Sequence, residues 1–227
     1  MIVIRTITDL QAEMAGDFAW RKKELTLLRS TVYARRNDAN LNAFIRSAVA
    51  LLYAHWEGFV KFVGTSYLEF VARQHVRHCD LATNFLAVAM GRAIFDASTS
   101  KKMAGRIGIV DFFRNGLSQK SNIQWQGGVN TKANLGAAVL QEIILKLGLD
   151  YAPHQTKEKL IDEKLLRNRN HIAHGQYLVV GYDEYMDLHV EILRLMQVFY
   201  DQVEDAAMAR KYLTTPPVAA PVAQPNP

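Results

Sequence analysis

Apolar residues recur at spacings of three and four along most of the 227-residue chain, which is the period of an amphipathic α-helix. No stretch shows the alternation of apolar and polar positions that is typical of strands, and no internal repeat is visible. The pattern therefore predicts an all-α fold. The expected helices cover residues 7–36, 41–78, 81–95, 101–113, 134–147, 156–175 and 182–212.

Two stretches interrupt the helical pattern. Residues 97–132 are punctuated by Ser, Thr and Gly, and they predict an irregular insertion that contains one short helix. Five of the six prolines lie in the last 12 residues, where the sequence has neither periodicity nor charge. We therefore expect a single domain over residues 1–213, followed by a disordered Pro/Ala-rich tail over residues 214–227.

The composition is that of an ordinary soluble globular protein, with 49% hydrophobic and 22% charged residues. Cys79 is the only cysteine, which excludes a disulfide framework and zinc sites built on paired thiolates. The longest apolar run, from Ala48 to Ala54, is far too short to span a membrane, and the N-terminal sequence lacks the apolar segment of a signal peptide. These features predict a cytoplasmic protein with no membrane segment.

The formal net charge of +5 is unevenly distributed along the chain. Residues 91–132 hold seven basic and two acidic side chains, whereas residues 133–227 hold nine basic and twelve acidic ones. Such a basic zone attracts a phosphate backbone, although a solvated loop rich in Lys and Arg has the same composition. If the substrate is RNA, this zone should border the catalytic cleft, and the residues that steer the substrate there would be Lys101, Lys102 and Arg106.

One short stretch, LLRNRNHIAHGQ at residues 165–176, concentrates polar side chains at the end of a predicted helix. Cations near a helix C-terminus complement the helix dipole, and glycine commonly ends a helix, so these residues have a purely structural explanation. A functional explanation is also open, because Asn170 and His174 share a helical face that Arg169 can reach. The set offers a fixed cation, a polar positioning group and an imidazole that titrates near neutral pH. The candidate functional residues of the stretch are Arg167, Arg169, Asn170, His171 and His174.

The hexamer RNHIAH at residues 169–174 resembles the R-N-x-x-x-H signature of the HEPN superfamily of all-helical nucleases and nucleotide-binding domains. Residues 51–70 and 130–150 resemble helices of a bacterial HEPN branch of MAE-type nucleases, in the same order and at the same spacing. The resemblance extends over about residues 40–212. It implies a HEPN-like bundle of long antiparallel helices.

The resemblance also implies an activity, that of a metal-independent endoribonuclease. The ribose 2′-OH would attack the adjacent phosphodiester and leave a cyclic phosphate and a free 5′-OH. His174 would be the acid/base group and Arg169 would bind the scissile phosphate, while Asn170 would position a ligand oxygen or His174. The assignment is physically sound because RNA contains its own nucleophile and arginine can grip two phosphate oxygens. Arg167 and His171 would be surface residues or would steer phosphates.

The same resemblance suggests partners and a biological setting. Superfamily members usually act as homodimers with two motifs facing each other, which suits an active site that has one Arg and one His. The family deploys such nucleases as toxins or antiviral defence effectors, so an antitoxin or a defence-system partner protein is expected. The alternative is a non-catalytic HEPN module that binds nucleotides, RNA or a partner protein. We expect no cofactor, because the sequence contains no glycine-rich phosphate-binding motif.

Two further groups of residues allow other chemistry. Glu57 is flanked by large apolar residues, and it either orients Arg169 or His174 or pairs with Lys61 on a wetter face. His171 and His174 are three residues apart, but no third ligand stands at helical spacing, so we expect no metal site.

Overall fold

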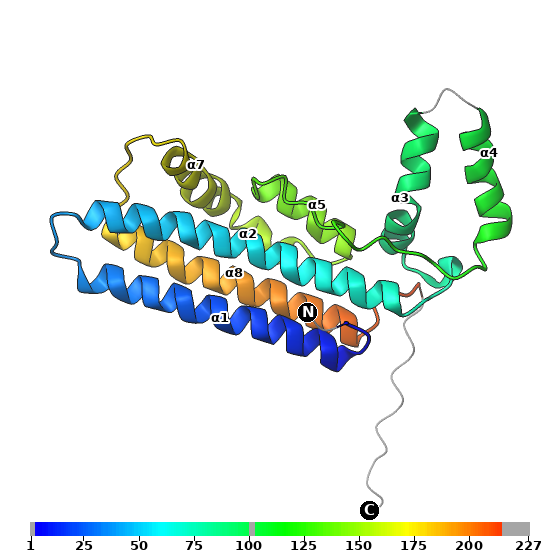
Figure 1. The fold of residues 1–227 in the computed structure, drawn as a ribbon, viewed down its shortest axis with the longest axis horizontal. Coiled ribbons are helices and arrows are strands. Elements are labelled where there is room, and N and C mark those ends of the chain that lie inside the picture. Colours follow the sequence, from blue (N-terminus) through cyan, green and yellow to red (C-terminus); the bar gives the residue numbers. More distant parts are fainter. Residues whose placement is uncertain (1–2, 100–102, 215–227) are drawn as a thin grey trace, which may run out of the picture.

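The computed structural model describes residues 3–99 and 103–214. Three long helices, α1 (Ile7–Ala34), α2 (Leu41–Arg73) and α8 (Tyr182–Met208), lie side by side (Figure 1). α1 runs antiparallel to α2 after a tight turn, and α8 runs parallel to α2 (Figure 1). The described residues contain isolated β-bridges but no strand, which confirms the all-α prediction.

α2 is the central helix of the bundle. Its 33 residues span about 50 Å at 1.5 Å per residue, and it packs against α1, α8, α7 and α5. The largest side chains that it buries are Tyr53, Trp56, Phe59 and Tyr67. The predicted helix to residue 78 was too long, because His75 adopts a left-handed backbone (φ 49°) and turns the chain away from the helix axis.

α1 is held by one narrow face and by its first turn. Its buried residues recur every four or seven positions and face α2 and α8, namely Leu10, Met14, Arg21, Leu25 and Val32. Thr6 caps the helix: its hydroxyl accepts the Asp9 N–H at 3.1 Å, while Asp9 accepts the Thr6 N–H at 2.8 Å. This reciprocal capping satisfies two backbone N–H groups that a helix start otherwise leaves without partners.

A second group of shorter helices lies along another face of α2, near the middle and one end of the bundle (Figure 1). It comprises α5 (Ala137–Leu147), the short α6 (Ala152–Gln155), the π-helical segment η3 (Leu160–Leu166) and α7 (Arg167–Ala173). α5 begins three residues later than predicted, and Gly148 ends it in the left-handed conformation (φ 67°), as expected.

The short helix expected near residues 101–113 of the predicted insertion is present, and a π-helical segment follows it. α3 (Thr83–Thr99), α4 (Met103–Asp111) and the π-helical segment η2 (Phe112–Gly116) form an arm at the end of the bundle opposite α7 (Figure 1). α4 buries none of its residues and packs mainly against α3 and η2. The chain then continues without regular structure to α5, through Gly127 in a turn with φ 68°.

The remaining expectations concern the ends and the membrane. The short η1 (His78–Asp80) pairs with the end of the described chain through the Thr214 N–H and the Asp80 carbonyl at 3.0 Å. Most of the tail predicted to be disordered, residues 215–227, lies outside the described residues. Among the helices that the structure describes, none is both long and apolar enough to cross a bilayer.

Candidate active site

The polar stretch at residues 165–176 forms the end of α7 and the turn that follows. His174 is the capping residue, and Gly175 adopts the left-handed conformation (φ 69°) that ends the helix. The Gly175 N–H donates to the Ile172 carbonyl at 3.1 Å, and the Gln176 N–H donates to the His171 carbonyl at 2.9 Å. This pair of bonds is a Schellman motif, which satisfies the last carbonyls of the helix and reverses the chain direction directly after His174.

The π-helical segment η3 leads directly into α7 and is hydrogen-bonded to the start of α5. The Asp162 carboxylate accepts the N–H of Ala137, the first residue of α5, at 2.7 Å. A Cβ at residue 136 would lie only 2.8 Å from that carboxylate, so the approach requires Gly136. Ile161 and Leu165 are fully buried and fix the inner face of η3. The start of α7 is therefore set by packing rather than by a cap of its own.

Arg169 is a half-buried cation in a defined orientation. Its guanidinium carbon lies 4.4 Å from the centroid of the buried Tyr53 ring on α2. Its Nη1 donates to the Asn170 side-chain oxygen at 2.7 Å. Contact with an aromatic face attracts the cation, and the amide fixes its rotation. Since the guanidinium has five N–H donors, a phosphate can still be bound by the others.

The Asn170 amide connects Arg169 to the loop before α5. Its Nδ2 donates to the Asn134 side-chain oxygen at 3.2 Å, while its oxygen accepts from Arg169. Asn170 was predicted to position a ligand oxygen or His174. No described hydrogen bond joins Asn170 to the His174 imidazole, so the amide contacts Arg169 instead. Asn134 was not anticipated as a member of this network.

The loop over residues 130–136 has an unusual backbone. Lys132 and Ala133 both adopt left-handed conformations, with φ of 54° and 51°. Non-glycine residues in this region cost of order 1–3 kcal/mol each and persist only where their surroundings hold them. Here the Asn130 side-chain oxygen accepts the Lys132 N–H at 2.8 Å, and the Asn134 N–H donates to the Thr131 carbonyl at 3.0 Å. The loop thus brings Asn134 to α7 at a cost in backbone strain.

Tyr53 and Glu57, one turn apart on α2, hold the other side of this loop. The Tyr53 hydroxyl accepts the Leu135 N–H at 2.6 Å, and Glu57 accepts from the Thr131 hydroxyl at 2.5 Å. Burial raises the pKa of Tyr53 to about 12, and the Glu57 charge adds to this effect, whereas the Leu135 N–H and Arg169 oppose it. Tyr53 therefore stays a neutral phenol at physiological pH.

The orienting role expected of Glu57 stays a prediction, and no direct hydrogen bond or ion pair of the described residues supports it or the alternative pairing with Lys61. Its carboxylate contacts neither Arg169 nor His174, and it forms no ion pair with Lys61 among the described residues. The physical reason is that the loop over residues 130–136, which the sequence did not place, lies against this face of α2. Glu57 acts on Arg169 only indirectly, through the loop and the neighbouring Tyr53.

His174 is exposed at the C-terminal cap of α7, and no hydrogen bond or ion pair of the described residues involves its imidazole. Arg167 is exposed and His171 is half-buried on the same helix. Within the part of the chain that the structure describes, no three His, Cys, Asp or Glu side chains are grouped to hold a metal ion. The structure thus places a held arginine and an exposed imidazole five residues apart at the end of α7.

The family model RiboL-PSP-HEPN matches residues 17–205, from the first half of α1 to the end of α8. The chain belongs to the RiboL-PSP-HEPN family. The predicted superfamily is thereby confirmed, under this family name rather than that of the MAE-type branch. HEPN domains are generally associated with RNases, so the family indicates a nuclease-type or RNA-related module. No curated protein and no solved structure matches the chain significantly.

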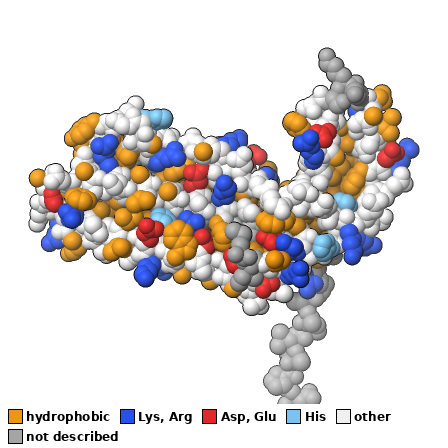
Figure 2. Space-filling view, in the orientation of Figure 1, with side chains coloured by type: hydrophobic (Ala, Val, Ile, Leu, Met, Phe, Trp, Pro, Cys, Tyr) orange, Lys and Arg blue, Asp and Glu red, His pale blue; other side chains and the backbone are white. Residues whose placement is uncertain are grey.

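The structure corrects the location of basic residues around this RiboL-PSP-HEPN motif. Arg106 is exposed on α4, in the arm at the opposite end of the bundle from α7, so it does not border Arg169 and His174. Lys101 and Lys102 lie outside the described residues. Of the basic zone predicted over residues 91–132, Lys132 lies in the strained loop two residues before Asn134, and it lines a hollow with Glu142 and Lys146 of α5. Figure 2 shows Lys and Arg side chains scattered over this face rather than gathered in one band.

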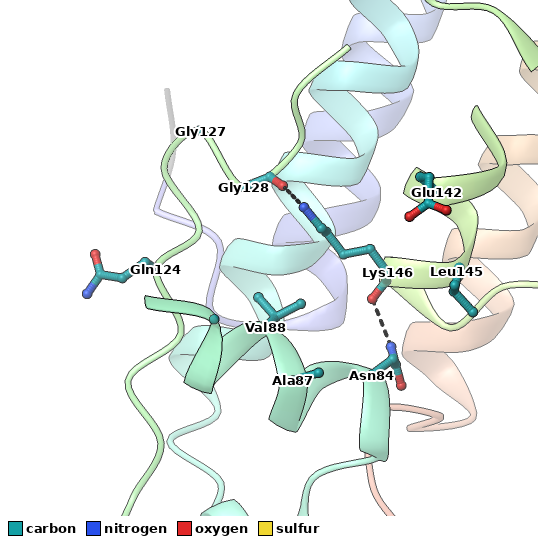
Figure 3. A pocket seen from close by; sticks show the side chains of 10 residues that line it. Asn84, Ala87, Val88, Gln124, Gly127, Gly128, Glu142, Leu145 and Lys146 are labelled. Carbon is teal, nitrogen blue, oxygen red and sulfur yellow. Dashed lines mark hydrogen bonds between the residues drawn. The ribbon is translucent and has the colours of Figure 1, made fainter. Parts of the chain in front are cut away.

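A groove of about 460 Å³ lies away from the motif, between α3, α5 and the loop at Gly127 and Gly128 (Figure 3). Lys146 donates from Nζ to the Gly128 carbonyl at 2.8 Å, and its own carbonyl accepts from the Asn84 amide at 2.9 Å. These polar groups are used to attach the loop and α3 to α5. Trp125, in the same loop, packs against the core, and Arg73 lies 5.9 Å from its ring.

Proposed function

We propose that this protein is a metal-independent endoribonuclease whose active site is built on Arg169 and His174. The observation that carries the proposal is the fixed guanidinium of Arg169, held between the Tyr53 ring and the Asn170 amide. A preorganised arginine stabilises the charge that develops on a phosphate in the transition state, with little reorganisation during the reaction. The open imidazole of His174 lies at the end of the same helix.

The proposed reaction needs only groups that RNA and this site supply. The ribose 2′-oxygen forms a bond to phosphorus as the bond from phosphorus to the 5′-oxygen breaks. The 2′-OH proton passes to a base, and the departing 5′-oxygen takes a proton from an acid, which leaves a 2′,3′-cyclic phosphate and a 5′-OH. An imidazole near neutral pH serves in either role. Arg169 binds the phosphate throughout, and Asn170 keeps the guanidinium oriented.

A homodimer is part of this proposal. One imidazole cannot donate and accept at opposite sides of the phosphate at the same time, so a second copy that faces the first would supply the other proton-transfer group. A symmetric pair also doubles the arginines available to the phosphate. Its test is the oligomeric state in solution, combined with activity of mixed dimers that carry Arg169→Ala in one copy and His174→Ala in the other.

RNA cleavage by the purified protein in EDTA tests the proposal. Wild type should cut, and Arg169→Ala and His174→Ala should not. Arg167→Ala and His171→Ala are matched controls, because they remove a cation and an imidazole from the same helix while leaving the proposed pair intact. These controls should retain most of the activity. Cleavage that persists in both Arg169→Ala and His174→Ala would refute the assigned roles.

A non-catalytic binding module is the second candidate, favoured by the absence of any described contact between His174 and the network of Arg169. Such a module would bind RNA, a nucleotide or a partner protein through Arg169 alone. Expression in a bacterial host distinguishes the two. A nuclease acting as a toxin or defence effector should arrest growth in a His174-dependent way, unless an antitoxin or partner protein is present, whereas a binding module should not.

A further inference from the structure

The segment that follows the motif has no regular secondary structure and is hydrogen-bonded to the start of α2. Arg46 donates from Nη2 to the Gln176 carbonyl at 3.0 Å. The Asn42 amide donates to the Leu178 carbonyl at 3.1 Å, and its oxygen accepts the Val180 N–H at 3.4 Å. Two side chains of α2 thus bind the backbone of every second residue of the segment, at positions 176, 178 and 180. We call residues 176–180 the anchored strip.

The anchored strip exposes apolar side chains at alternate positions. Tyr177 is 82% exposed and Val179 is 64% exposed, whereas Val180 is only 2% exposed and packs into the core. The Tyr177 ring is among the most exposed large apolar side chains of the described residues, and its backbone is fixed on both sides. Because the backbone at Tyr177 is already fixed, only side-chain entropy is lost when a flat ligand stacks on its ring.

The strip lies directly beside the proposed chemistry. Tyr177 follows His174 by three residues, so their Cα atoms are at most about 11 Å apart. The Schellman turn at Gly175 fixes the path between them. A base stacked on Tyr177 would therefore belong to a nucleotide close to the phosphate held by Arg169.

The charge around the strip fits a polyanion. The sequence from residue 164 to residue 182 contains basic residues and no carboxylate, and α2 has none before Glu57. Glu163 precedes this stretch, and Asp183 and Glu184 follow it in the first turn of α8, where the Glu184 carboxylate pairs with Lys164 at 2.6 Å. A second copy of the same strip would bring like charges together, which costs free energy unless an anion lies between them. A strand of RNA supplies that anion.

We propose that the anchored strip is a docking site for single-stranded RNA, in which Tyr177 stacks on a nucleobase next to the scissile phosphate. The inference rests on the proposed nuclease function, and it adds the single-stranded form of the substrate and a residue that positions it. Stacking on an aromatic side chain tolerates any base and does not depend on the sugar. Double-stranded RNA keeps its bases paired and stacked, so it cannot use Tyr177 in this way.

The test is binding of a labelled single-stranded DNA of about twelve nucleotides, a length within the range that such strand-binding sites contact. DNA lacks the 2′-OH, so the otherwise intact protein can be titrated without cleavage. Tyr177→Ala should raise Kd by about 5- to 140-fold, which corresponds to the usual value of a base–aromatic stack. Tyr177→Phe and Tyr177→Trp should stay within about twofold of wild type, because both keep the ring.

Phe95→Ala is the matched control, since Phe95 is 59% exposed on α3 in the distant arm, and it should leave Kd unchanged. The dependence of Kd on salt should be the same for Tyr177→Ala and wild type, because the ring contacts no phosphate. Equal Kd for Tyr177→Ala and wild type would overturn the proposal. So would conversion of a dimer into a monomer by Tyr177→Ala, because the strip would then be a contact between copies.

The two proposals fail in distinguishable ways. If RNA is cleaved in a manner that depends on Arg169 and His174 but Tyr177→Ala binds single strands like wild type, only the docking site is wrong. If Tyr177→Ala weakens the binding of single strands but the wild-type protein does not cleave RNA, the nuclease proposal fails and the proposal of a strand-binding strip remains.

Discussion

Removal of one oxygen atom from Tyr53 should destabilise the protein. The Tyr53 hydroxyl accepts the Leu135 N–H at 2.6 Å, and both residues are buried. Tyr53→Phe leaves that N–H without an acceptor in a place that water does not reach. An unpaired buried donor costs about 1–3 kcal/mol in the free energy of unfolding. For a protein of this size the melting temperature should fall by about 2–12 °C.

A comparison of Tyr53→Phe with Tyr53→Leu separates stability from catalysis. Phenylalanine keeps an aromatic face beneath the Arg169 guanidinium, 4.4 Å from the ring centroid in the wild type, whereas leucine does not. The loss of a cation–π contact of about 0.5–2 kcal/mol should lower kcat/KM for RNA by about 2- to 30-fold in Tyr53→Leu relative to Tyr53→Phe.

The assay is thermal unfolding of each variant together with steady-state cleavage of one RNA substrate, measured below the lowest melting transition. The reasoning is refuted if Tyr53→Phe has the same melting temperature as the wild type, because the Leu135 N–H would then need no acceptor. It is also refuted if Tyr53→Leu and Tyr53→Phe have the same kcat/KM.

Other predictions concern acid stability, packing and charge. Gly136→Ala should unfold at a lower temperature and lose activity, because its Cβ would meet the Asp162 carboxylate that caps α5; full activity with an unchanged melting curve would contradict this. Arg106→Ala should leave KM for RNA unchanged, while Lys132→Ala should raise it. A raised KM in Arg106→Ala with an unchanged KM in Lys132→Ala would contradict this and would indicate that the distant basic zone steers the RNA. The free energy of unfolding should fall as the pH drops below about 6.5, since burial lowers the pKa of three histidines in the folded state and the unfolded chain therefore takes up protons first. These histidines are His55, His154 and His189. Thermal melts between pH 7 and pH 5 measure the effect, and a melting temperature that does not change with pH would contradict it.

The sequence predicted helices well wherever the apolar period was long and the ends carried local signals. Gly148 and Gly175 end helices in the left-handed conformation, as their positions indicated. The end of α2 could not be predicted in this way, because the left-handed conformation at His75 (φ 49°) is uncommon for any residue other than glycine and has no local sequence pattern. The two helices of the arm were predicted over residues 81–95 and 101–113, close to α3 and α4, whereas the π-helical form of η2 was not.

The candidate site was predictable only as far as one helix carries it. Arg169, Asn170 and His174 follow from their spacing, whereas Asn134, Tyr53 and Thr131 reach the site through tertiary contacts. The strained loop that brings them there has non-glycine residues at positive φ, and no local sequence pattern predicts that conformation. Glu57 was noticed for its apolar neighbours, but its partner is a threonine 74 residues away in the sequence. No sequence pattern indicates a role for Tyr177, and only its high exposed fraction in the structure identifies it as a candidate.

The chemistry of the cleaved ends tests the central claim most directly. RNA with one cleavage site should yield a 2′,3′-cyclic phosphate on one product and a 5′-OH, ready for phosphorylation by a kinase, on the other. A single 2′-deoxy substitution at the nucleotide before the cut should abolish cleavage, because it removes the nucleophile. Wild type and His171→Ala should give these products in EDTA, and Arg169→Ala and His174→Ala should give none. Products with 5′-phosphate ends, or cleavage of the deoxy-substituted strand, would contradict a 2′-OH attack at Arg169 and His174.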